Sequence, residues 1–372
     1  MRLLDRYLLR ELLVPLGYCL GGFLIFWISF DLVSEMNHFQ KQRLQATDVA
    51  AYYMIKTPEL LMVVVPMALL LALLYALTNH ARHHELTAIR AAGVGLWRIS
   101  LPYLAVGFVL SVELFAMNEL WVPDAADAAE EILSRYVAKK SNPRREWETN
   151  LFFDNTAAAR KWEIGAYNFK TRTMVSPKLN WHWPDRTHHE IYAEQAVWTN
   201  GLWVFYDVQQ FDYPPSGTDL PTVSRTNELA MPELSERPGR IKSEIKISRL
   251  NSIKDAKRAQ LSIKEIRTYL QWHPQLDASK RALLETKLQQ RWAVPWMCLV
   301  VVVIAIPFGA ASARRNVFVG VAASIFIVFA YFILRELSLA LGTGGYLAPW
   351  LAAWAPNLFF GVTGIALTFK VR

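Results

Sequence analysis

The chain has few cysteines and few charged residues for its length. Cys19 and Cys298 are the only cysteines in 372 residues, and each lies inside an apolar run. The polar middle of the chain therefore has no thiol for a disulfide, and the chain has no cysteine-based metal site. Charged residues make up 19% of the chain and apolar residues 53%. This composition argues against an ordinary soluble globule.

Several catalytic motifs are also missing. No glycine is followed by lysine, which excludes the Walker A loop of a P-loop ATPase. Neither a Gly-x-Ser-x-Gly elbow nor a His-Glu-x-x-His pair occurs. His80, His83 and His84 lie close together, but a solvated helix end explains them better than a metal site. We therefore expect a non-catalytic protein that itself binds no metal or cofactor.

Long apolar runs are the main feature that is present. Six of them, three before and three after a polar insert, can each cross about 30 Å of hydrocarbon as a helix; they cover residues 12–30, 60–79, 99–117, 293–313, 316–334 and 346–369. The sequence predicts a membrane α-helical protein with six transmembrane helices. No small-residue cleavage site follows the first run, so we expect an anchor that is not removed.

The basic residues predict the orientation in the membrane. If the N-terminus is cytoplasmic, ten basic residues face the cytoplasm: Arg2, Arg6, Arg10, Arg82, Arg90, Arg98, Arg314, Arg315, Lys370 and Arg372. The opposite loops hold only Lys41, Arg43, Lys56 and Arg335. Because cytoplasmic loops carry an excess of Lys and Arg, both termini are expected in the cytoplasm. The insert is then outside, which is the periplasm in a bacterium with two membranes.

The polar insert has the pattern of an all-β domain. Between residues 147 and 247 the helical period disappears, and short apolar runs alternate with turn residues. Asn200-Gly201 lies between two such runs and predicts a hairpin with a type I′ turn. We expect a β-jelly-roll domain within residues 123–265. Residues 1–122 then form the first three helices, and residues 266–372 form a connecting helix and the last three.

The second strand of this hairpin is apolar on both faces. Strand alternation predicts Trp203 and Phe205 on one face and Leu202, Val204, Tyr206 and Val208 on the other. One interpretation is a well-filled core with some exposed aromatic residues. The other is an apolar lumen that is open to a lipid chain. The sequence leaves both interpretations open.

The segment 240–267 is basic, with nine Lys or Arg against three Asp or Glu. A solvated face that leads from the final strand into a connecting helix explains it, and contact with acidic lipid phosphates is the alternative. No fold signature for nucleic-acid binding accompanies it, so no nucleic-acid partner is expected. The helical period returns from Leu261.

Two features lie within the apolar runs themselves. Glu113 is an acid inside the third run, where it either has a function or forms a hydrogen bond to a neighbouring helix. Gly17 and Gly21 form a pair of small residues, four positions apart, in the first run. Such a pair suits the close approach of another helix, either as ordinary packing or as part of a gate.

The loop after the second apolar run contains a short amphipathic helix at residues 84–93. Leu86, Ile89 and Gly93 fall on one side, Glu85 and Arg90 carry charge, and Gly93 is placed to end the helix. The helix either lies on the membrane surface or docks into a partner protein, as a transporter requires when its motor is a separate chain.

Taken together, these segments resemble the LptF/LptG family, the permeases of the lipopolysaccharide export ABC transporter. Nearly the whole chain is covered. The resemblance rests on residues 4–11, Pro66 and the Leu-rich run after it, residues 85–93, Asn118-Glu119 with Pro123, the hairpin with Trp198 and Trp203, residues 261–266, Arg291 with Pro295, Ile306-Pro307-Phe308, Arg314-Arg315, and Trp354-Ala355-Pro356-Asn357. The opening Leu4-Asp5-Arg6-Tyr7 and residues 31–35 favour LptG over LptF.

The resemblance implies a permease subunit in the Gram-negative inner membrane. Its partners would be a sister permease, LptF if this chain is LptG, and a dimer of the ATPase LptB, which binds the ATP and Mg. Lipopolysaccharide would enter from the outer leaflet beside the first and fifth helices. It would then pass through the periplasmic jelly roll to LptC and the LptA bridge toward the outer membrane. A membrane-anchored periplasmic binding or scaffold module without transport activity is the alternative.

The same resemblance assigns roles to residues. Residues 84–93 would be the coupling helix, with Glu85 facing a basic residue of the ATPase and Leu86, Ile89, Arg90 and Gly93 completing the contact. The candidates for substrate contact are the basic residues Lys41, Arg43, Lys56 and Arg335 and the aromatic residues Trp198, Trp203 and Phe205. Asp31 and Glu35 make the end of the first apolar run more acidic than such a headgroup site would require. Gly17 and Gly21 are candidates for helix packing or a gate.

Overall fold

The computed structural model describes residues 3–41, 44–126, 128–129, 132, 147–182, 187–214, 220–248, 260–310 and 317–370. The chain divides into two compact units, Met1–Ser134 with Ala282–Arg372 and Arg135–Arg281. We call the first the membrane unit and the second the β unit. The boundary placed after residue 265 from the sequence falls inside helix α8 (Ile263–Trp272). Contact clustering instead ends the β unit at Arg281, after α8.

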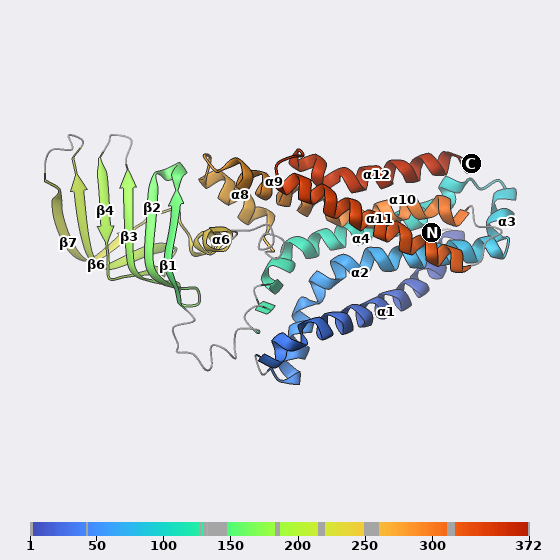
Figure 1. Cartoon of the computed structure of the whole chain (residues 1–372), viewed down its shortest axis with the longest axis horizontal. Coiled ribbons are helices and arrows are strands. Elements are labelled where there is room, and N and C mark those ends of the chain that lie inside the picture. Colours follow the sequence, from blue (N-terminus) through green and yellow to red (C-terminus); the bar gives the residue numbers. More distant parts are fainter. Residues whose placement is uncertain are drawn as a thin grey trace. The chain divides into compact units, whose positions relative to one another are not determined.

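The membrane unit is helical (Figure 1). Its elements are α1 (Leu3–Lys41), α2 (Ala46–Arg82), α3 (Glu85–Ala91), α4 (Leu96–Leu120), α9 (Ala278–Ala293, which crosses the unit boundary), η3 (Val294–Trp296), α10 (Met297–Ala310), α11 (Val317–Thr343) and α12 (Pro349–Lys370). Within the described residues, six helical segments are long and apolar enough to cross a membrane: Leu3–Asn37, Ala46–Arg82, Leu96–Leu120, Ala278–Phe308, Ile325–Thr343 and Pro349–Lys370. The prediction of six spans is confirmed.

The fifth span extends further than the sequence predicted. Its end was expected at residue 334, because Arg335 and Glu336 follow there, but α11 continues to Thr343. The uncharged residues after Glu336 prolong the helix, which ends where Gly345 adopts a φ of +79°. Arg335 therefore lies inside the helix, about two turns before its end.

Helix α2 is the centre of the membrane unit, and α1 is at its edge. Helix α2 packs against α1, α4, α10 and α11, and 67% of its most apolar stretch is buried, against 11% for α1. Helices α4 and α12 both approach α10 closely at a glycine. A Cβ atom added at Gly107 of α4 would lie 2.7 Å from Val302 Cγ2, and one added at Gly364 of α12 would lie 2.9 Å from Ile304 Cα.

The β unit contains one antiparallel sheet of seven described strands (Figure 1). The strands are β1 (Trp147–Asn155), β2 (Arg160–Asn168), β3 (Thr173–His182), β4 (His188–Tyr192), β5 (Gln195–Thr199), β6 (Leu202–Tyr213) and β7 (Thr222–Met231), with the short helix η2 (Thr156–Ala158) after β1. Their order is β1-β2-β3-β4-β6-β5, and β7 also pairs with β6. An inserted β domain is thus confirmed. Asn200 and Gly201 have φ values of 52° and 84° and form the predicted hairpin turn between β5 and β6.

The alternation of β6 is broken at Asp207, which has a φ of 52°. Val208 therefore belongs to the buried cluster with Trp203 and Phe205. The sequence had placed Val208 on the opposite face, and this prediction was wrong, because a residue in the left-handed region interrupts the period of two. Asn150 in β1 and Ser176 in β3 also have positive φ values.

A helix occupies residues that were predicted to continue the β pattern. Helix α6 (Pro238–Ser248) lies within the segment up to residue 247 that had been assigned to strands. Ile241 and Ile245, four residues apart on one face of α6, belong to the same buried cluster as Trp162, Trp203 and Phe205. Burial of this face stabilises the helix despite its polar composition. The return of helix after Leu261 is confirmed by α8, which starts with a Ser262 and Glu265 capping box.

Candidate functional site

Helix α3 is a short helix between α2 and α4, bounded by two residues with positive φ. His84 precedes it with a φ of 61°, and Gly93 follows it with a φ of 85°. The amide N–H groups of Gly93 and Val94 donate to the carbonyls of Arg90 and Ile89, which satisfies the end of the helix. Gly93 thus ends the helix as predicted.

The apolar side of α3 faces the membrane unit itself. Leu86 is buried in the core cluster of the membrane unit, and Ile89 packs against that cluster. Thr87, Ala88 and Arg90 are exposed. Leu86 and Ile89 therefore hold α3 on its own chain, and the opposite side of the helix is the surface that a partner protein can reach.

Glu85 is bound by two side chains from neighbouring helices. Tyr7 of α1 donates its hydroxyl to Glu85 Oε2 at 3.0 Å, and His80 Nδ1 of α2 lies 2.6 Å from the same oxygen. Partial burial alone would raise the pKa of Glu85, but the hydrogen bonds with His80 and Tyr7 and the charge of the nearby histidines lower it below its usual value. The Glu85 carboxylate is therefore ionised at neutral pH, and its side chain remains 36% exposed.

A second polar contact joins α1 to α4 in the same unit. Arg98 Nη1 lies 2.8 Å from Asp5 Oδ1, and Arg98 Nη2 donates to Asp5 Oδ2 at 3.0 Å. One hydrogen bond and one close charge contact thus join the two side chains. We call Asp5, Tyr7, His80, Glu85 and Arg98 the α1 tether, because they join α1 to α2, α3 and α4. Sequence analysis predicted no such role for Tyr7, His80 or Arg98, because residues 93 positions apart, such as Asp5 and Arg98, carry no local signal of contact.

The basic candidates for substrate contact have different surroundings. Lys56 is part-buried and bonds to Asp31 at 3.0 Å and to the hydroxyl of Tyr52 at 3.0 Å. Asp31 thus neutralises Lys56. Lys41 is exposed at the end of α1, and Arg43 lies outside the described residues. Arg335 lies over the Phe332 ring at 5.8 Å, and its buried Nε has no hydrogen-bond partner among the described residues.

The aromatic candidates lie in or against the core of the β unit. Trp203 and Phe205 are fully buried, and the Trp203 indole donates to the carbonyl of Glu236 at 2.6 Å. Trp198 is half-buried and packs edge-on against Trp203 at 5.2 Å. At Trp203 and Phe205 the structure has a filled core, and of the three residues only Trp198 has exposed surface.

Other predicted residues lie at contacts within the membrane unit or on its surface. Arg291 Nη1 donates to Asn118 Oδ1 at 3.1 Å. Asn357 donates to the Ala293 carbonyl at 2.7 Å and accepts from Tyr331 at 2.8 Å. The first bond joins α9 to α4, and the two bonds of Asn357 join α12 to both α9 and α11. Gly17 and Gly21 have no atom within 4 Å of an added Cβ, and Glu113 is exposed; Arg314 and Arg315 lie outside the described residues.

Comparison with protein families identifies the chain. The family model of the lipopolysaccharide export system permease LptF/LptG matches residues 6–370. The chain belongs to the LptF/LptG family. Membership agrees with the six spans, with the inserted β domain and with a multi-pass protein of the inner membrane. The model describes LptF and LptG together, so the assignment to LptG stays a prediction. A search of curated proteins gives no match.

Proposed function

We propose that this chain is the permease subunit of an ATP-driven exporter that extracts lipopolysaccharide from the outer leaflet of the inner membrane. The β unit would be periplasmic, both termini cytoplasmic, and ATP with Mg would be hydrolysed by a separate LptB dimer. The match of the permease family model over residues 6–370 carries this proposal. The absence of a Walker A loop in the sequence supports the assignment of ATP hydrolysis to another chain.

Helix α3 is the proposed contact with the ATPase, and the α1 tether is the proposed path of the movement. Because Tyr7 and His80 bond to Glu85, a displacement of α3 acts directly on α1 and α2. Helix α1 is the least buried of the spans, so it can shift with little loss of packing within its own chain. Its Gly17 and Gly21 face open space, which suits the approach of a helix of the sister permease.

The proposed substrate contacts follow from the surroundings of each candidate. Arg335 has an unsatisfied Nε within the described residues, which suits a phosphate group. Lys41 is exposed and can contribute charge, whereas Lys56 would first have to leave Asp31. Trp198 is the proposed lipid contact in the β unit. Lipid could reach Trp203 and Phe205 only after the core had opened, with transfer onward to LptC and LptA.

The coupling proposal is tested with the purified permease pair and LptB in lipid. We expect Glu85→Lys to reduce LptB co-purification and to lower lipopolysaccharide-stimulated ATP hydrolysis about tenfold, because a charge is reversed at the proposed contact. Tyr7→Phe removes only the hydrogen bond from α1 to Glu85, so it should retain LptB while stimulation falls. Glu228→Lys reverses a charge on an exposed site of β7 and serves as the control. Unchanged association and stimulation in Glu85→Lys would refute the coupling role.

The proposed orientation is tested by cysteine labelling in intact cells. An impermeant maleimide should modify Thr226→Cys, which is exposed on β7, without permeabilisation. Ala88→Cys on α3 should react only after the inner membrane is opened. Labelling of both sites in intact cells would refute the proposal. ATP-dependent transfer of lipopolysaccharide to LptC in proteoliposomes distinguishes the permease from a scaffold module.

A further inference from the structure

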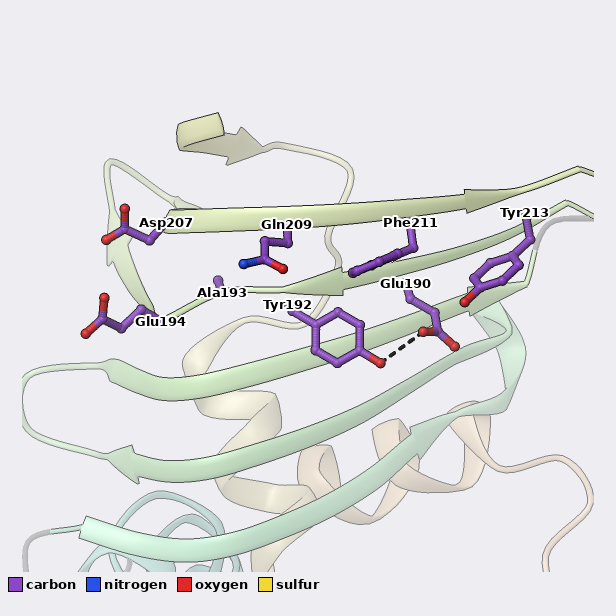
Figure 2. Close-up of a pocket in the computed structure, with 8 residues that line it drawn as sticks. All are labelled: Glu190, Tyr192, Ala193, Glu194, Asp207, Gln209, Phe211 and Tyr213. Carbon is purple, nitrogen blue, oxygen red and sulfur yellow. Dashed lines mark hydrogen bonds between the residues drawn. The ribbon is translucent and has the colours of Figure 1, made fainter. Parts of the chain in front are cut away.

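The sheet of the β unit carries a cavity of about 620 Å³ where β4 and β6 lie side by side (Figure 2). Its lining includes three carboxylates and three aromatic rings: Glu190, Glu194, Asp207, Tyr192, Phe211 and Tyr213. The size is in the range of cavities that hold small molecules. None of the roles assigned above involves these residues.

The cavity lies on the face of the sheet that the core does not use. Ile191 belongs to the buried cluster, so its neighbours Glu190 and Tyr192 point to the opposite face. Glu190 pairs with Phe211 and Tyr192 with Gln209 across β4 and β6, which places these side chains together. The cavity is therefore separate from the core that contains Trp203 and Phe205.

The carboxylates stand at the two ends of the cavity, and the rings lie between them. Figure 2 shows Glu194 and Asp207 at one end, Glu190 beside Tyr213 at the other, and Tyr192 and Phe211 between. Glu190 and Glu194 are four residues apart along one nearly extended segment, roughly 13 Å. The Tyr192 hydroxyl donates to Glu190 Oε2 at 2.9 Å and orients this carboxylate.

The lining residues include no basic side chain. Among the described residues, Lys178, Arg225 and His188 border the cavity. His188 Nε2 lies 3.6 Å from Glu190 Oε1 and its ring stacks on Tyr213; burial lowers the pKa of His188, so the ring is neutral at neutral pH. Lys178 lies 5.7 Å from the Tyr192 ring centre and 3.6 Å from Glu163 Oε2, so its charge is partly neutralised. Arg225 is exposed and lies opposite Gln209 on β7. Three carboxylates and no cationic side chain therefore line the cavity, which favours cations and disfavours the phosphate groups of a lipid headgroup.

We propose that this cavity binds a linear polyamine. Ammonium groups at the ends of such a molecule would bond to Glu190 at one end and to Glu194 and Asp207 at the other. Its methylene chain and any inner ammonium would lie over Tyr192 and Phe211, whose ring faces attract cations. The site does not depend on the proposed export function, because its charge is opposite to the charge that binds a lipid phosphate.

The test measures binding of spermidine to the full-length protein in detergent by isothermal titration calorimetry. We expect saturable binding with one site per chain, and weaker binding by about tenfold or more for n-butylamine, which has a single charge. The double variant Glu190→Gln/Glu194→Gln should weaken spermidine binding by about tenfold or more, because both ends lose charge. Glu228→Gln, an exposed carboxylate of β7 outside the cavity, should leave binding unchanged.

Two further measurements keep the result decisive. Phe211→Leu retains an apolar side chain but loses the ring, so we expect binding severalfold weaker, with an unchanged thermal transition. Mg²⁺ at the same ionic strength should compete poorly with spermidine. Equal binding by the double variant and the wild type would overturn the proposal. So would equal competition by Mg²⁺, which would indicate general attraction to an acidic surface.

Discussion

Large apolar side chains have opposite positions in α1 and β6. In α1, Tyr18, Phe26 and Phe30 are mostly exposed, whereas in β6 Trp203 and Phe205 are fully buried. The difference follows from the solvent. Lipid solvates an apolar side chain without penalty, so α1 needs no cover from its own chain. In water, an exposed apolar side chain costs free energy. The β unit must therefore bury its apolar side chains in a filled core.

Polar side chains differ between the two units as well. In the membrane unit they bond one helix to another, as Arg291 does to Asn118 and Tyr331 to Asn357. In the β unit, Arg160 and Glu236 form a buried ion pair at 3.0 Å, and Arg160 also stacks on Trp181. The membrane unit thus uses polar groups to join helices, and the β unit uses them to complete a core.

The comparison of aromatic residues makes the strongest prediction. Trp203→Ala should destabilise the β unit by about 3–5 kcal/mol, because it leaves a cavity and removes the hydrogen bond to the Glu236 carbonyl. Phe26→Ala on α1 should change stability little, since lipid replaces the lost contacts. The stability of both variants is measured by unfolding the full-length protein in denaturant, with protease cleavage of the β unit as the readout. Equal effects would contradict the distinction between the two solvents.

The glycines of the membrane unit sharpen the contrast between α1 and the central helices. Gly364→Ala should destabilise the helical bundle by about 1–3 kcal/mol, because the new Cβ meets the backbone of Ile304 and Val303. Gly17→Ala meets no atom and should be neutral or slightly stabilising. Thermal unfolding in detergent compares the two variants. A large loss of stability of the isolated chain in Gly17→Ala would show that α1 packs more tightly than the structure indicates.

The smallest predicted effect is a difference between two carboxylates in how their contribution to stability responds to pH. Bonds to His80 and Tyr7 outweigh partial burial and lower the pKa of Glu85, so its stabilising contribution is present at neutral pH and is lost as pH falls through this lowered value. Glu244 is buried beside His273, and burial raises its pKa despite this partner. Its folded form binds a proton more readily than its unfolded form.

Acidification from pH 7 toward 5 should therefore strengthen the contribution of Glu244 and leave that of Glu85 unchanged. Amide hydrogen exchange measures the local stability of the helix that carries each carboxylate, α6 for Glu244 and α3 for Glu85. The matched variant Glu244→Gln should abolish the response of α6, whereas Glu85→Gln should leave α3 as insensitive to pH in this range as it is in the wild type. The same pH response in α6 for the wild type and for Glu244→Gln would refute the assignment.

Much of the architecture could be predicted from the sequence, because the signals are local. The apolar runs, the Asn200-Gly201 turn and the end of α3 at Gly93 depend on residues that are neighbours in the chain. The helix α6 could not be predicted in this way, since its polar composition hides the fact that Ile241 and Ile245 insert into a core formed by strands. The position of Val208 was missed because one positive φ at Asp207 changes the alternation.

The candidate site shows the same division. The sequence by itself determined that Glu85 lies on a short amphipathic helix after the second span, because period and composition are local properties. Only the tertiary structure decided that this carboxylate bonds to Tyr7 and His80 and that Leu86 and Ile89 face their own chain. It also decided that Lys56 is neutralised by Asp31, 25 residues earlier. Such contacts depend on how helices pack, and packing joins residues whose separation in the chain carries no information about their distance in space.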